Sequence, residues 1–225
     1  MSQIHVEAQQ NSPRVAGEGT NVGVRGTRDG LMYTAGWKEA LVLEGRVHTF
    51  SVGTAEAGVL GGGAGTIIDQ DQPEFGVSVP NGTALIPLEI WIGFGTDLNA
   101  IGEAAQAMVI ADTALAYAGD GTVTSETPVN AISDGGVTSV ATAFSAATAD
   151  ITDPTESRII AVKAWGYSIL TAGAGVGSFN LHYVADVPQI LMGPAAFYGY
   201  WGATGAATGW AVVTWAEVPE ARYTV

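Results

Sequence analysis

The residues best suited to chemistry in this 225-residue chain are three histidines, His5, His48 and His182. They are widely separated in the sequence, so they could meet only through long-range folding. No GxSxG motif, which marks a nucleophilic serine at a sharp strand-to-helix turn, is present to accompany them. We therefore expect each histidine to have an ordinary polar or half-buried role, and we predict that the chain is not an enzyme.

Carboxylates form two further groups, each within a predicted loop. The groups are Asp69, Asp71 and Glu74, and Asp150, Asp153 and Glu156. Oxygen ligands of this kind bind Ca²⁺, although neither group follows the EF-hand pattern. Two carboxylates facing each other across a cleft about 5–10 Å wide could instead hydrolyse a glycosidic bond. Solvated loop charge is the preferred interpretation. Calcium binding and catalysis are the alternatives, and no other cofactor is predicted.

The longest strand signal is NGTALIPLEIWIGFGT at 81–96, which opens with an Asn-Gly turn pair. Side chains alternate between the two faces of a strand. One predicted face is uniformly apolar and consists of Ile86, Leu88, Ile90, Ile92 and Phe94. The other is mixed and consists of Leu85, Pro87, Glu89 and Trp91. This pattern is typical of a strand that packs one side against a second sheet.

Turn signals recur at short intervals along the rest of the chain. Between them lie β-like runs at 45–52, 75–79, 137–147, 158–170, 178–185, 195–201 and 210–218, and 31–43 is a short strand pair or a strand with a helical turn. The pattern predicts roughly eight to ten strands, no confident helix and no parallel crossover units. We therefore predict an all-β fold, an antiparallel sandwich or barrel. Residues 31–225 are expected to form this single domain, preceded by an extended arm at 1–30.

Residues 103–117 can be interpreted in two ways. Their Ala, Glu, Gln and Met content favours a helix. A strand would instead pair with the preceding run in a hairpin. The strand is preferred, because the surrounding sequence is β-like and local preferences usually agree with the global fold.

Charge is sparse and uneven. Charged residues make up only 13% of the chain against 47% hydrophobic residues, and the net charge is −14. Five of the eight basic and five of the 22 acidic residues lie in 1–46, which leaves a strongly acidic body with three basic and 17 acidic residues. We therefore expect no direct contact of this body with nucleic acid. A surface so poor in charge is expected to be covered by other subunits.

The sequence also argues against cysteine-dependent, membrane-spanning and secreted proteins. The chain contains no cysteine, so disulfides and thiolate chemistry are absent. No apolar run approaches the ~18 residues of a membrane span. The N-terminus lacks the apolar region of a signal peptide, and we expect synthesis in the host cytoplasm.

Tryptophans are the most prominent candidates for contacts between subunits. We predict such contacts for Trp91, Trp201, Trp210 and Trp215. An alternative platform for stacking sugars would consist of Trp37, Tyr198, Tyr200 and Trp201. Interface aromatics are the preferred interpretation of this second set as well.

The segments VPNGTALIPLEIWIGF at 79–94 and TGWAVVTWAEVPE at 208–220, together with the polar arm and the short strands, resemble viral jelly-roll coat proteins, most closely those of bacteriophage virions. The resemblance implies a jelly-roll sandwich that self-associates into a capsid with arm exchange between neighbours. It implies homo-oligomers, other virion proteins as partners and location in the virion. The neutral arm departs from the strongly basic arms of coat proteins that package genomes directly.

Two further functions remain alternatives. The first is a receptor- or glycan-binding virion module, such as a spike, a fibre tip or a lectin-like domain. The second is a polysaccharide-active hydrolase on the same scaffold, which needs two carboxylates converging in a groove. A sandwich fold hosts many functions, so the fold by itself does not choose between them.

Overall fold

The computed structural model describes residues 36–54, 56–61, 68–97, 104–114, 122–134, 136–148, 151, 154, 158–166, 176–204 and 206–220. The predicted arm at 1–30 lies outside them. The described residues form one short helix, α1 (Trp37–Leu43), and the following strands: β1 (Val47–Val52), β2 (Val59–Gly61), β3 (Phe75–Val79), β4 (Thr83–Asp97), β5 (Ala104–Asp112), β6 (Thr124–Glu126), β7 (Val129–Asn130), β8 (Thr142–Ser145), β9 (Arg158–Gly166), β10 (Val176–Val184), β11 (Leu191–Met192), β12 (Ala195–Ala203) and β13 (Ala207–Pro219).

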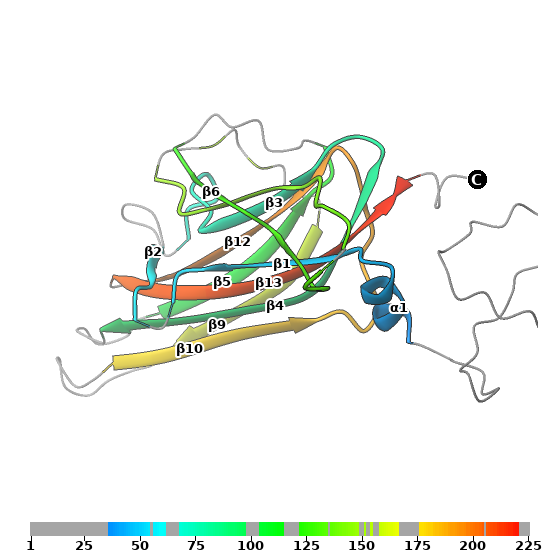
Figure 1. Cartoon of the computed structure of the whole chain (residues 1–225). Helices are drawn as coiled ribbons and strands as arrows, with labels where there is room; N and C mark the ends of the chain where they lie inside the picture. Colours follow the sequence, from blue (N-terminus) through cyan, green and yellow to red (C-terminus); the bar gives the residue numbers. More distant parts are fainter. Residues whose placement is uncertain are drawn as a thin grey trace, which may run out of the picture.

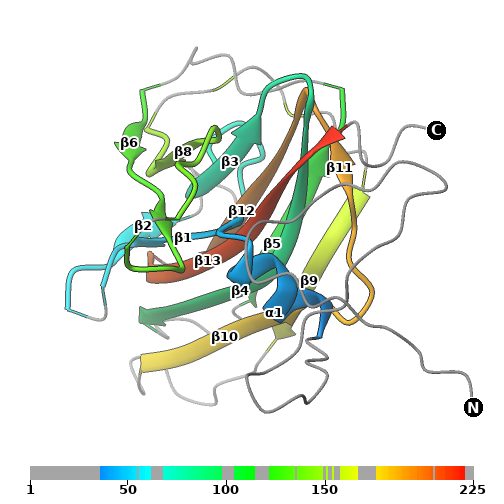
Figure 2. The ribbon, with the colours of Figure 1, turned by 45° about the vertical axis from the view of Figure 1, so that its right-hand side comes forward.

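The strands form two antiparallel sheets. The seven-stranded sheet has the order β10-β4-β13-β1-β7, with β11 alongside β4 and β2 alongside β13. The six-stranded sheet has the order β6-β8-β3-β12-β5-β9. Figures 1 and 2 show the two sheets stacked face to face. The prediction of an all-β antiparallel sandwich is confirmed.

The main core lies between the two sheets and draws aromatic rings from both. Phe50 on β1 contacts Trp215 on β13 edge-on, with 5.8 Å between the ring centroids. Across the sandwich, Phe50 meets Phe75 on β3 edge-on at 6.4 Å, and Phe75 contacts Trp201 on β12. Pairs of this geometry each contribute about 0.5–1.5 kcal/mol beyond the area that they bury. The contact between Phe50 and Phe75 therefore joins the two sheets, and the other two pairs extend the aromatic cluster within each sheet.

Strand β4 does not keep one apolar face along its length, contrary to the prediction. Thr214 pairs with Glu89, whereas the next residue, Trp215, pairs with Pro87, which leaves Leu88 as an extra residue in β4. A β-bulge of this kind reverses the alternation of side chains beyond it. On the inner side of the bulged strand, the residues that reach the main core are Leu85, Ile90, Ile92 and Phe94.

Ile86 and Leu88, predicted to share that inner face, lie instead in a separate apolar cluster. The other buried residues of this cluster are Val47, Ala216 and Val218. Helix α1 covers this cluster through Leu41 and Val42, at the end of the seven-stranded sheet seen in Figure 2. Of the two alternatives for 31–43, the strand pair is wrong for 37–43, whereas the helical structure found there agrees with the predicted helical turn. Among the described residues, no helix has the length and hydropathy needed to cross a membrane.

The ambiguous segment at 103–117 contains a strand, as preferred, but not the expected hairpin. Strand β5 pairs with β12 and β9 in the six-stranded sheet, while β4 belongs to the opposite sheet. Both strands direct an apolar face at the same core, and in β5 that face consists of Ala105, Ala107, Val109 and Ala111. A core between two packed sheets needs an apolar strand face from each sheet, and β4 and β5 provide these faces from opposite sides.

Candidate functional site

The first predicted carboxylate group lies just before β3 and is used within the fold. Asp69 Oδ1 accepts the backbone N–H of Asp71 at 3.2 Å, and the buried Glu74 accepts the backbone N–H of Trp201 at 3.1 Å. The N–H of Ile151 donates to the carbonyl of Asp71 at 2.8 Å. In the described parts of the chain, no three acidic or histidine side chains are grouped so that they could hold a metal ion. Outside those parts lie Asp150, Asp153 and Glu156.

The predicted sugar-stacking set does not form an exposed platform. Tyr198 is 2% exposed and Tyr200 and Trp201 are 0% exposed, whereas Trp37 on α1 is 40% exposed. Strand β12 is buried on both faces, because one faces the main core and the other is covered by a second apolar cluster. The Tyr200 hydroxyl donates to the carbonyl of Gln70 at 2.9 Å, and burial raises the pKa of this phenol far above its usual value.

The four tryptophans predicted at subunit interfaces divide into two pairs. Trp201 and Trp215 are 0% exposed and belong to the main core, so their indoles are not available to a neighbouring subunit. That part of the prediction is wrong, because both side chains point inward from strands with sheet partners on both sides. Trp91, which is 39% exposed, and the half-buried Trp210 lie on the outer face of the seven-stranded sheet.

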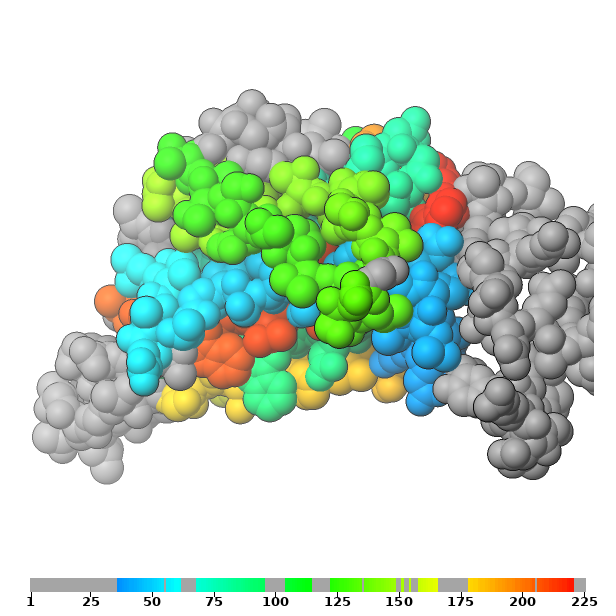
Figure 3. All heavy atoms as spheres, viewed as in Figure 1, coloured from blue at the N-terminus to red at the C-terminus, as the bar shows by residue number. Residues whose placement is uncertain are grey.

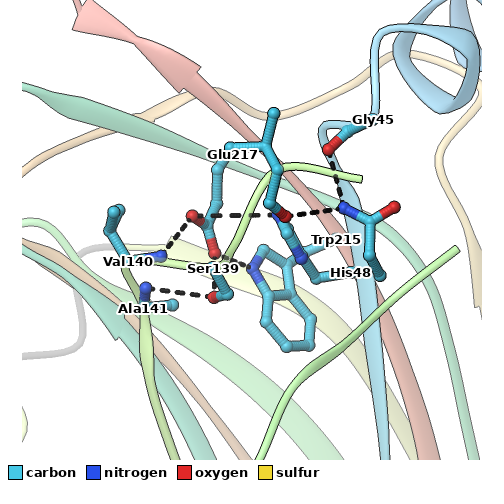
Figure 4. Close-up of polar contacts among 9 residues, drawn as sticks. Gly45, His48, Ser139, Val140, Ala141, Trp215 and Glu217 are labelled. Carbon is cyan, nitrogen blue, oxygen red and sulfur yellow. Dashed lines mark hydrogen bonds and ion pairs between the residues drawn. The ribbon is translucent and has the colours of Figure 1, made fainter. Parts of the chain in front are cut away.

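Glu217 on β13 is the centre of a buried polar cluster at one end of the sandwich (Figure 4). Its carboxylate accepts hydrogen bonds from the Ser139 hydroxyl at 2.5 Å, the Val140 backbone N–H at 2.8 Å and the Trp215 indole N–H at 3.0 Å. Three donors satisfy most of the carboxylate's capacity without a basic side chain. The cluster therefore attaches residues 139–140 to the end of β13.

His48 on β1 lies beside this carboxylate and is 1% exposed. Its Nε2 atom is 4.0 Å from a Glu217 carboxylate oxygen, and within the described structure neither ring nitrogen has a hydrogen-bond partner. Burial lowers the pKa of His48, and the nearby Glu217 charge offsets this only in part. The Ser139 hydroxyl donates to Glu217 and not to His48, so these residues do not form a nucleophile–base–acid triad. We interpret the cluster as structural.

A second polar and aromatic site lies on the outer face of β10, β4 and β13, and we call it the aromatic groove. The strand register places Trp91 opposite His182, and Gly93 between Asn180 and Trp210. Side chains of these three strands are exposed on the face seen in Figure 3. The groove has a volume of ≈ 580 Å³, and its lining includes Glu56, Trp91, Gly93, Asn180, Thr208 and Trp210.

The exposed indole of Trp91 is held in place by its neighbours. The His182 ring contacts it at 4.6 Å between centroids, and the Trp210 ring lies nearly parallel to it at 6.4 Å with an interplanar angle of 11°. His182 is itself held by a hydrogen bond to Glu89, with 2.7 Å between Nε2 and Oε1. The Trp210 indole rests on the backbone of Gly93, where a Cβ atom would lie 2.9 Å from the ring. Such a surface can stack against a flat or ring-shaped ligand.

One local feature of the sequence indicates part of this groove. Ser178, Asn180 and His182 alternate with buried residues along β10, which marks a polar outward face. Their relation to Trp91 and Trp210 depends on which strands pair with β4, and alternation within one strand does not specify that.

No protein-family model matches the chain, and no curated protein or solved structure matches it significantly. The two sites are therefore interpreted from their geometry.

Proposed function

We propose that this chain is a self-assembling coat subunit of a bacteriophage virion, built on a jelly roll and acting through packing between subunits, not catalysis. In a jelly roll, eight strands wind into two packed sheets. The strand orders β1-β13-β4-β10 and β3-β12-β5-β9, between which the chain passes repeatedly, support this winding. The proposal includes exchange of the arm at 1–30 between neighbours and contacts with other virion proteins.

The observation that carries the proposal is the unpaired edge formed by β9 and β10, which carries three exposed aliphatic side chains. Among the described residues, no strand pairs with the outer side of either strand. Ile159 and Val162 on β9 are 49% and 60% exposed, and Val184 on β10 is 42% exposed. Long sheet edges with apolar side chains associate readily with other chains. This edge is therefore the proposed contact surface between subunits.

The two edge strands are held next to each other, so they present one continuous surface. The Trp165 ring on β9 contacts Phe179 on β10 at 5.2 Å between centroids, and Lys163 Nζ donates to the Asn180 carbonyl at 3.3 Å. A typical specific interface buries about 1,600 Å² in total. Repetition of such a contact around a closed shell would add strength through avidity.

The experiment compares V162E with V129E. The two valines are 60% and 61% exposed, and both lie on strands at a sheet edge, so the control is matched in residue type, exposure and setting. The proposal expects wild-type protein and V129E to assemble, and V162E to remain monomeric with unchanged circular dichroism. Light scattering after size exclusion and electron micrographs measure this. A wild-type protein that stays monomeric at high concentration, or equal assembly of V162E, would contradict the proposal.

A further inference from the structure

We propose that the aromatic groove binds a neutral oligosaccharide, with Trp91 as the stacking surface. This site goes beyond the proposed coat function. It also differs from the aromatic set that the sequence suggested for sugars, most of which is buried.

The first argument is the state of the Trp91 indole. A 39%-exposed tryptophan in the middle of a paired sheet leaves apolar ring surface in water. The contacts with His182 and Trp210 fix the orientation of the ring before a ligand arrives, which lowers the entropic cost of binding. Sugar rings carry apolar C–H faces, and these pack against the face of an indole.

The second argument is the set of polar groups around the ring. The polar residues that line the groove are Thr54, Glu56, Ser178, Asn180 and Thr208. Hydroxyls, an amide and a carboxylate provide both donors and acceptors for sugar hydroxyl groups. A surface that combines an aromatic ring with a few convergent polar groups is typical of small-molecule sites.

The wall that contains Glu56 has a defined position. The Ala57 N–H donates to the Thr54 hydroxyl, and the Thr54 N–H donates to the Ala57 carbonyl, each at 2.9 Å. At Gly58 a Cβ atom would lie 2.6 Å from a Thr208 methyl carbon, so the loop packs closely onto β13. The groups on the two sides of the groove are therefore held at a fixed separation.

Other classes of ligand fit the groove less well. The described lining contains a carboxylate and no lysine or arginine, and the chain carries a net charge of −14, so anionic ligands are repelled. A wholly apolar ligand would leave the surrounding polar groups without partners. An extended peptide cannot add a strand beside Trp91 itself, because β4 is paired on both sides by β10 and β13.

The test measures binding of neutral tetrasaccharides of glucose, galactose, mannose or N-acetylglucosamine to the full-length protein by isothermal titration calorimetry, beside sialylated and sulfated oligosaccharides. W91A is compared with W37A, because the two tryptophans are 39% and 40% exposed but Trp37 lies on α1, away from the groove. We expect W91A to lose at least about tenfold in affinity for the neutral ligand and W37A to bind as the wild type does.

G93A provides a second variant that keeps every polar group of the groove. Its Cβ would lie 2.9 Å from the Trp210 ring and displace the indole, so affinity should fall while circular dichroism is retained.

The proposal is overturned if no neutral tetrasaccharide binds, if anionic sugars bind more tightly, or if W91A and W37A lose affinity equally. Loss of self-association in W91A would also overturn it, because the groove would then be a subunit contact. Sugar binding by a wild type that never assembles would instead support this site and contradict the coat function.

Discussion

The seven-stranded sheet carries two histidine–glutamate pairs, and their environments differ sharply. His48 and Glu217 are buried on its inner face, with 4.0 Å between nitrogen and oxygen. His182 and Glu89 lie on its outer face at 2.7 Å, with side chains 39% and 54% exposed. The shorter pair is the more exposed one, so the distance between the histidine nitrogen and the carboxylate oxygen does not by itself indicate which pair the fold depends on.

Burial explains the difference. The inner carboxylate is stabilised by three neutral donors from Ser139, Val140 and Trp215, and His48 stays uncharged because burial lowers its pKa. The outer pair competes with water and is worth little to stability, although it positions a ring beside Trp91. The inner pair therefore serves folding, and the outer pair serves the surface that we propose for ligand binding.

The largest effect is expected for Glu217→Ala. The change leaves the donors of Ser139, Val140 and Trp215 without their acceptor, and we expect the free energy of unfolding to fall by about 3 kcal/mol. Urea denaturation followed by tryptophan fluorescence measures this. Glu217→Gln keeps an acceptor oxygen and should lose less. If Glu217→Ala lowered the free energy of unfolding by less than about 1 kcal/mol, water would be replacing the carboxylate as acceptor. The distinction between the inner and the outer pair would then be wrong.

A smaller effect is expected for His48→Phe. The pKa of His48 is lowered in the folded state, so the unfolded state takes up the proton first as pH falls below about 6.5. The free energy of unfolding of the wild type therefore decreases as the pH falls below this value. At pH 7.5 the variant should lie within about 1 kcal/mol of the wild type, since two unpaired nitrogens are removed. At pH 5 the His48→Phe variant should be more stable than the wild type, as measured by the same urea denaturation. A difference between the two proteins that does not change with pH would refute this.

The smallest effects are expected for Glu89→Ala and His182→Ala. Both side chains are well exposed, and each change should alter the free energy of unfolding by no more than about 0.5 kcal/mol, less at high salt. Parallel urea titrations at low and high salt provide the measurement. If either variant lost as much stability as Glu217→Ala, burial would not be what separates the two pairs.

Alternation within strands was predictable only as far as the first bulge. Ile90, Ile92 and Phe94 do face the core together, as their spacing predicts, but Ile86 and Leu88 do not. The extra residue in β4 is detected only through its pairing with β13, a partner more than a hundred residues away. A second irregularity between Val109 and Ile110 affects the pairing of β5 with β9 in the same way. Local periodicity cannot anticipate either one.

The sequence also does not reveal which tryptophans of the candidate sites are exposed. Trp91 and Trp215 are alike in type and both occupy strands, yet one is 39% exposed and the other 0%. Which tryptophan faces water depends on which side of its strand meets the second sheet. The predicted interface role is therefore wrong for the buried Trp201 and Trp215, and it stays a prediction for Trp91 and Trp210.

The amino-acid sequence by itself determined that this chain forms antiparallel strands with short turns, because two-residue alternation and Gly-rich turns are local properties of the backbone. It also determined an acidic body with few charges. Only the tertiary structure decided that β4 and β5 lie in opposite sheets and that α1 covers the separate apolar cluster of Ile86 and Leu88. It also decided that Glu217 is buried while Glu89 is exposed. These features depend on pairing between distant segments, whose register is selected by the shared core and not by any one strand.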